Sequence, residues 1–146
     1  MRALLTVFVL ALAAPDREDP TPREKTKPIH EQILGEWQLV NSVVGGRNEK
    51  KDGVLTFTRT EIHITENGQR RSGDDADYVI DATKKPAAID ISVKRDGSQK
   101  IEGILKIEGD QLTLCFPRGG GAMRPTDFVS TPQTGIAVMQ FTRIKK

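Results

Sequence analysis

From Gly35 onwards the chain consists of short segments in which apolar and polar residues alternate, separated by residues that favour tight turns. Where apolar and polar residues alternate one by one along a strand, one face of the strand packs on a core and the other faces solvent. Several short segments of this kind, spaced by turn residues, are typical of all-β sandwiches and barrels. We therefore expect an all-β fold.

The turns between these segments indicate how the strands pair. Gly45-Gly46, Asn67-Gly68, Asp96-Gly97 and Gly109-Asp110 are each flanked by alternating apolar residues, as in two-residue hairpin connections. Hairpins at such short spacing predict antiparallel pairing between strands that are neighbours in sequence.

The parity of the apolar positions changes between Phe57 and Ile62, so we place a turn at Thr58–Glu61, because a continuous strand would reverse its buried face there. Closing eight meandering strands removes exposed edges and leaves an interior for side chains or one small ligand. We therefore predict an up-and-down eight-stranded barrel in preference to a sandwich, after a short helical turn at Ile29–Leu34. The predicted strands are Glu36–Val44, Gly53–Thr58, Glu61–Glu66, Asp77–Ala82, Ala88–Lys94, Lys100–Glu108, Gln111–Pro117 and Gly135–Ile144.

The first 28 residues differ from the rest and are expected to lie outside the barrel, which we assign to residues 29–146. Residues 1–13 read as a signal peptide, with a basic start, an apolar segment and the small-x-small pattern Ala11-Leu12-Ala13. Residues 14–28 are rich in proline and charge and predict a disordered tether. We expect an exported protein, periplasmic or secreted, that is a monomer.

Composition argues against several classes of function. The 22 Lys+Arg and 20 Asp+Glu residues leave a net charge of only +2, so we expect no nucleic-acid partner. The apolar leader is too short for stable membrane insertion. One cysteine and two histidines predict no zinc site. We expect no metal, cofactor or catalytic residue, and thus no enzyme, because no nucleophile with a matched base can be assembled.

The pattern around single residues predicts mainly structural or solvent-exposed positions. Cys115 lies in an apolar run and is predicted to be a packed thiol, and His63 alternates with isoleucines and should face solvent. The acidic cluster at residues 74–77 lacks the spacing of a calcium loop and is expected to be solvated. In the segment 124–128 we expect Phe128 to plug the barrel while Arg124 pairs with Asp127.

The start of the first strand, Gly35-Glu36-Trp37, resembles the Gly-x-Trp signature that opens lipocalin barrels. In that family the tryptophan closes the floor of the barrel beneath a basic side chain from the last strand, and Arg143 matches that position. The resemblance implies that Trp37 and Arg143 are structural.

Three further strings, at residues 85–90, 109–116 and 124–128, are similar to landmarks of a family of lipocalin-like domains found largely in planctomycete bacteria. The family has no established activity. The resemblance implies a calycin-type barrel, often exported and small, and it transfers no catalytic residue, substrate or cofactor.

Two hypotheses of function follow from a barrel of this size. In the first, it binds a small apolar or amphipathic molecule, with Arg124 as a polar determinant. In the second, it is a protein-interaction or envelope-structural module whose interior is filled by large side chains. The inward-facing residues predicted to contact a ligand are Ile89, Ile91, Leu105, Leu112, Leu114 and Met139.

Overall fold

The computed structural model describes residues 26–95, 99–119 and 122–146. The signal peptide predicted at residues 1–13 and most of the tether predicted at 14–28 lie outside the described residues. A short helix, α1 (Ile29–Gln32), precedes the first strand, as expected. It is one turn long, and its first hydrogen bonds run from the amides of Glu31 and Gln32 to the Pro28 carbonyl at 2.9 and 3.0 Å.

Ten strands follow α1 and form one antiparallel sheet. Eight of them correspond to the predicted strands, with ends that differ by at most one residue, and the other two extend hairpins. The strands are β1 (Gly35–Val44), β2 (Arg47–Asn48), β3 (Val54–Phe57), β4 (Glu61–Glu66), β5 (Gln69–Arg70), β6 (Ala76–Asp81), β7 (Ala87–Val93), β8 (Lys100–Glu108), β9 (Gln111–Pro117) and β10 (Ile136–Arg143).

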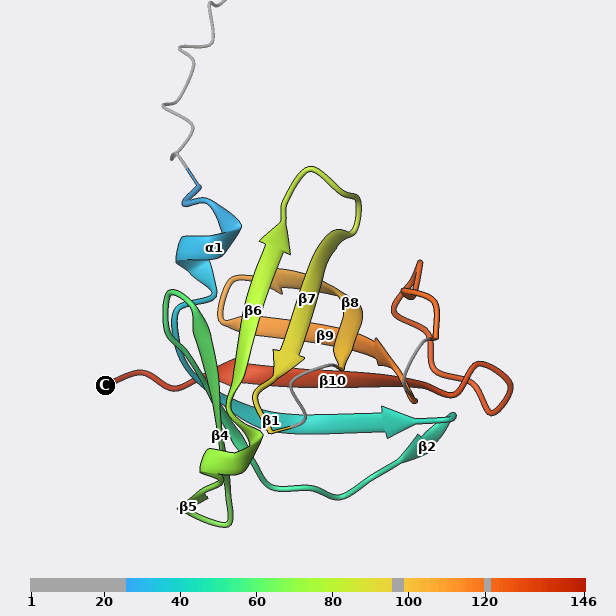
Figure 1. The fold of residues 1–146 in the computed structure, drawn as a ribbon, viewed down its shortest axis with the longest axis horizontal. Coiled ribbons are helices and arrows are strands. Elements are labelled where there is room, and N and C mark those ends of the chain that lie inside the picture. The colour runs from blue at the N-terminus through green and yellow to red at the C-terminus, as the bar shows by residue number, and fades with distance from the viewer. Residues whose placement is uncertain (1–25, 96–98, 120–121) are drawn as a thin grey trace, which may run out of the picture.

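The sheet closes on itself because β1 pairs with β3 on one side and with β10 on the other. Around the barrel the order is β1, β3, β4, β6, β7, β8, β9 and β10, so each strand lies beside its neighbour in sequence once the hairpin extensions β2 and β5 are set aside (Figure 1). This confirms the predicted antiparallel barrel of eight strands.

The turn residues explain why the chain reverses where it does. Gly45 and Gly46 have φ values of +55° and +75°, and Asn67 and Gly68 have +50° and +74°, the left-handed conformations that two-residue hairpin turns require. The predicted break at Thr58–Glu61 is present, with the Thr58 amide donating to the Glu61 carbonyl at 2.9 Å.

A bulge in β1 changes which residues face inward. Leu39 pairs with Phe141 and Asn41 with Gln140, so Val40 has no partner on β10 and is 60% exposed. Before the bulge the odd-numbered residues of β1 point into the barrel, and after it the even-numbered ones do. One extra residue in a strand is enough to reverse which side chains face inward.

The barrel holds its main core inside and a second apolar cluster outside. The inner cluster of buried residues comprises Ile33, Trp37, Phe57, Ile62, Ile89, Leu105, Leu112, Leu114, Phe116 and Phe141. The outer cluster comprises Ile104, Cys115 and Val138, on three adjacent strands, and is covered by Phe128 and Ile136. Burying a side chain of this size contributes about 1.5–3 kcal/mol, so both clusters matter to stability.

Candidate functional site

One end of the barrel is closed by Trp37 and Arg143. The Trp37 indole donates to the Ile33 carbonyl at 2.7 Å, and the Arg143 guanidinium lies over the indole with its carbon 4.1 Å from the ring centroid. Arg143 also donates to the carbonyls of Leu34, at 2.9 Å, and of Gln32. These contacts join the last strand to the end of α1.

Above this floor the interior is solidly packed. Ile89 and Leu112 are 0% exposed, Leu105 is 1% exposed, and Phe57 is 2% exposed. Ile89, Leu105 and Leu112, which the sequence analysis predicted to contact a ligand, do point inward. They lie in this packed layer and do not line a cavity.

The other half of the barrel contains a cavity of about 290 Å³. It opens at the end that carries residues 51–53 and the 3-10 turn η1 (Ser72–Asp74), and Figure 1 shows η1 far from α1. Its apolar lining comes from every strand of the closed barrel. The apolar residues are Leu39, Val54, Leu55, Ile62, Ile64, Ala76, Ile91, Val93, Ile101, Leu114, Phe116, Met139 and Phe141.

Three residues that the sequence analysis named, Ile91, Leu114 and Met139, line the cavity. Ile91 and Leu114 each lie two residues further towards the open end than a packed residue of their own strand, which is Ile89 on β7 and Leu112 on β9. Met139 lies beside Leu114 on the neighbouring strand β10. Leu114 pairs with both Leu105 and Met139 across the sheet. The lining offers no charged group below its rim.

Charged residues form the rim, and each of them has a short contact, which for Asp52 is with a neutral amide. Exposed ion pairs add little to stability, typically about 0–1 kcal/mol, but in three of these four contacts a charge of opposite sign lies beside the rim residue. The contacts are Lys51 with Glu49 at 2.9 Å, Asp52 with the Gln38 amide at 2.8 Å, Glu66 with Arg71 at 2.9 Å, and Asp74 with Arg95 at 3.4 Å.

Gly103 shapes one wall of the cavity. It faces inward on β8, and a Cβ placed on it would lie 2.3 Å from Cε1 of Phe116 and 2.7 Å from the Cys115 carbonyl oxygen. The absence of a side chain therefore lets the Phe116 ring lie directly against the β8 backbone. A larger residue would drive the ring into the cavity.

Arg124 lies on the outside of the barrel and does not reach the cavity, so its predicted role as a polar determinant there has no support in the lining. Its guanidinium donates to the carbonyls of Gly103, at 2.7 Å, and Ile89, at 3.4 Å, and to the Asp90 carboxylate at 2.6 Å. Burial alone would raise the pKa of Asp90, but hydrogen bonds from Lys100 and Arg124 outweigh it and hold this pKa below its usual value.

Two expectations for the segment 124–128 were wrong. Phe128 does not plug the barrel but packs on the outer cluster, with the Lys106 ammonium 5.3 Å from its ring centroid. Asp127 does not pair with Arg124, and its carboxylate accepts from the Val129 amide at 3.3 Å. The segment crosses the outside because β8 and β9 expose apolar residues there that need cover.

The Cys115 thiol lies beneath this segment and is buried, as predicted. It donates to the Asp127 carbonyl at 3.4 Å. Burial, with a smaller contribution from the nearby Asp127 carboxylate, raises the pKa of Cys115 to about 11. The thiolate needed for nucleophilic chemistry is therefore scarce at neutral pH.

Other candidate sites are weaker. A wider, open hollow of about 680 Å³ lies beside α1, but Leu34 is its only apolar lining residue among Lys27, His30, Glu31 and Arg59. Within residues 26–95, 99–119 and 122–146, no three His, Cys, Asp or Glu side chains are grouped to hold a metal ion. Over the same part of the chain, no helix has the length and apolar character to span a membrane.

No protein family, curated protein or solved structure matches this chain.

Proposed function

We propose that this barrel binds a small, neutral, apolar molecule in the cavity at its open end. The observation that carries the proposal is the contrast between the two halves of the interior. One half is packed around Trp37, whereas the other keeps about 290 Å³ that is lined by apolar side chains and open to solvent. Empty apolar space costs stability, and a ligand that fills it recovers contacts.

The size of the cavity limits the ligand. An engineered apolar cavity of about 150 Å³ accommodates benzene, so this one suits a molecule of about ten to twelve non-hydrogen atoms. Two aromatic rings, Phe116 and Phe141, and the Met139 thioether lie in its wall, a combination that favours a flat aromatic or compact branched ligand. A long-chain fatty acid exceeds the available volume.

The rim favours a neutral ligand, because three of its four charges have a partner of opposite sign and the fourth, Asp52, accepts from the neutral Gln38 amide. An amphipathic molecule would have to compete with these contacts to place an ionic head group. At about 0.5 kcal/mol per non-hydrogen atom, a ligand of eleven such atoms would bind with a dissociation constant on the order of 100 μM. A carrier of this kind agrees with the sequence resemblance to exported lipocalin-like domains. We propose that the chain belongs to that family and that it is exported.

A fluorine NMR titration with 1-fluoronaphthalene tests the function. We expect line broadening and saturable binding, weaker binding of fluorobenzene, and none of a fluorinated sixteen-carbon fatty acid. Met139→Trp should weaken binding at least about tenfold by filling the cavity, and Ile64→Trp provides a second blocking variant.

Gln140→Trp is the matched control, because Gln140 neighbours Met139 on β10 but is exposed on the outer face. It should bind like the natural chain. Equal binding by Met139→Trp, Ile64→Trp and Gln140→Trp would show that the probe does not occupy the cavity. No binding to the natural chain or to Gln140→Trp would favour the filled-barrel alternative, a protein-interaction or envelope-structural module.

A further inference from the structure

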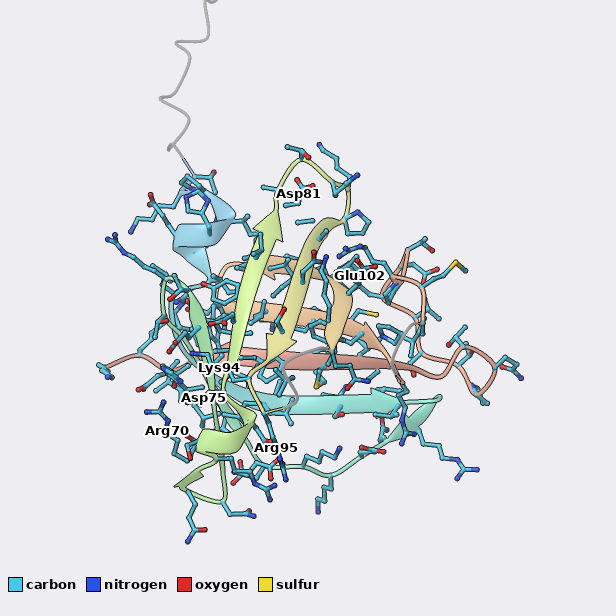
Figure 2. All side chains as sticks on the ribbon, viewed as in Figure 1. Arg70, Asp75, Asp81, Lys94, Arg95 and Glu102 are labelled. Atoms are coloured by element: carbon cyan, nitrogen blue, oxygen red, sulfur yellow. The ribbon has the colours of Figure 1, made fainter. Side chains whose placement is uncertain are left out.

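Three side chains meet on the outside of the barrel, directly behind the cavity wall. His63 on β4 is 17% exposed, and its Nδ1 lies 2.8 Å from Nη2 of Arg70 and 3.1 Å from Oδ1 of Asp75. The same Arg70 nitrogen donates to Oδ2 of Asp75 at 2.8 Å. Figure 2 shows Arg70 and Asp75 together beside β4, β5 and η1.

The two contacts of the imidazole Nδ1 have opposite requirements. Arg70 can only donate a hydrogen bond, so it needs a lone pair on Nδ1, whereas the ionised Asp75 can only accept one and needs a proton there. Among the described residues, Oδ1 of Asp75 is the one buried side-chain oxygen or nitrogen without a hydrogen-bond partner. A buried acceptor left without a donor is costly and calls for an explanation.

A proton on the imidazole resolves the conflict in favour of Asp75. When His63 is neutral, the 2.8 Å contact from Arg70 favours the tautomer with its proton on Nε2, because a proton on Nδ1 would meet this donor; Nδ1 then accepts from Arg70 and the Asp75 oxygen stays without a donor. When His63 is charged, Nδ1 donates to Asp75, and Arg70 must leave the ring while it keeps its bond to Oδ2. The cluster thus has two discrete arrangements, which are selected by one proton.

The remaining groups around the ring also bear on its charge. Nε2 lies 3.7 Å from the Glu61 carboxylate, which would accept from the charged ring. Glu61 is held in turn by Lys94, which lies 3.5 Å from Asp77 on β6. Thr56, opposite His63 on β3, is uncharged. The imidazolium would thus face two carboxylates and one guanidinium, with Lys94 one contact further away.

The cluster is joined to the cavity through the chain itself. Ile62 and Ile64, on either side of His63, line the cavity, and so do Asp74 and Ala76, on either side of Asp75. A direct bond from His63 to Asp75 would tie β4 to the segment that follows η1. That segment carries one side of the cavity mouth.

We propose that protonation of His63 tightens the mouth of the cavity and slows ligand exchange. The inference rests on the proposed function, because it concerns the same cavity. When His63 is neutral, Arg70 bridges the two segments through a flexible, half-exposed side chain. When His63 is charged, the imidazolium donates directly to the Asp75 carboxylate, a bond between two charged partners that has no flexible side chain between the two segments.

The test uses the full chain and combines two NMR measurements between about pH 5 and 8, where histidine ordinarily changes charge. In the ligand-free protein, the His63 ring and the amides of residues 74–76 should titrate with one common midpoint. With 1-fluoronaphthalene bound, the dissociation rate should fall about three- to tenfold from the high to the low end of this range, with the same midpoint.

His63→Gln should abolish this dependence, because its amide can accept from Arg70 and donate to Asp75 at every pH. Asp75→Asn is the second variant and should also remove it. His30→Gln is the matched control, since His30 is the only other histidine and is exposed on α1. The control should keep the full pH dependence.

The outcomes separate the two proposals. If the probe binds but its dissociation rate varies equally in the natural chain and in His63→Gln, the gating is overturned and the proposed function stands. If the amides of residues 74–76 do not follow the His63 ring, the switch itself is overturned. If no probe binds at any pH, the proposed function and the gating fail together, while the amide titration still decides whether the switch exists.

Discussion

The substitution Gly103→Ala tests the packing of the cavity wall most severely. The added Cβ would lie 2.3 and 2.4 Å from two carbons of the Phe116 ring. Carbon atoms pack best at about 3.5–4.0 Å, so the ring would have to withdraw by about 1.2 Å. The cavity that Phe116 lines offers space for this movement.

The ring can move, but the second obstacle is backbone. The Cβ would also lie 2.7 Å from the Cys115 carbonyl oxygen, on a strand held between β8 and β10. Overpacking of a core ordinarily costs about 1–3 kcal/mol, and a fixed backbone atom places this site in the upper part of that range. We expect Gly103→Ala to lower the free energy of unfolding by about 2–3 kcal/mol and to weaken binding of 1-fluoronaphthalene.

Urea unfolding followed by the fluorescence of Trp37, the only tryptophan, measures the effect. Gly73→Ala is the control, because the nearest atom to its new Cβ is Cδ of Arg95 at 3.9 Å, an ordinary contact. It should change stability by less than about 0.5 kcal/mol. Equal unfolding free energies for Gly103→Ala and the natural chain would refute the account of the wall.

Further predictions concern the groups around the cavity. Arg143→Met should cost about 1–3 kcal/mol in the same assay, because two carbonyls beside Trp37 lose their donor; an unchanged midpoint would contradict the closure described here. The Cys115 pKa of about 11 is raised, so its contribution to stability is complete below the unfolded thiol value of about 8.5 and is lost as pH rises through 11. In urea titrations at increasing pH, Cys115→Ala should lose less unfolding free energy between about pH 8.5 and 11 than the natural chain does. An equal loss in both proteins would argue against a buried thiol. The pKa of Asp90 is lowered, so its contribution is present above about pH 4 and is lost as pH falls through the folded value. Asp90→Asn and Arg124→Met should each lose less unfolding free energy than the natural chain when the pH is lowered below about 4. An equal loss in all three proteins would show that the pair of Asp90 and Arg124 is unimportant.

The strands could be predicted from sequence because alternation and turn residues agree along most of the barrel. Between Phe57 and Ile62 the change in parity alone placed the turn. The bulge at Val40 was not predicted, because the polar pair Asn41-Ser42 follows it and hides the change of face. Ser42 is buried and faces inward as a result.

The cavity could be predicted only in part. Alternation identifies which residues face inward, but it does not say which end of the barrel is packed, since that depends on the volumes of side chains from eight strands. Ile89 and Ile91 have the same pattern, and only Ile91 reaches open space. The placement of Phe128 on the outside does have a signal in the sequence: Ile104-Leu105 and Leu114-Cys115 are apolar on both faces of their strands and therefore need cover on the outside.

The central claim is that the open half of the barrel holds a small apolar molecule. The most direct measurement is a crystal structure of the protein with 1-bromonaphthalene, because the bromine is located by its anomalous scattering. We expect one strong bromine peak inside the barrel, among Phe116, Met139 and Phe141, and no such peak in Met139→Trp. Bromine found only on the outer surface, or an interior closed by side chains, would contradict it.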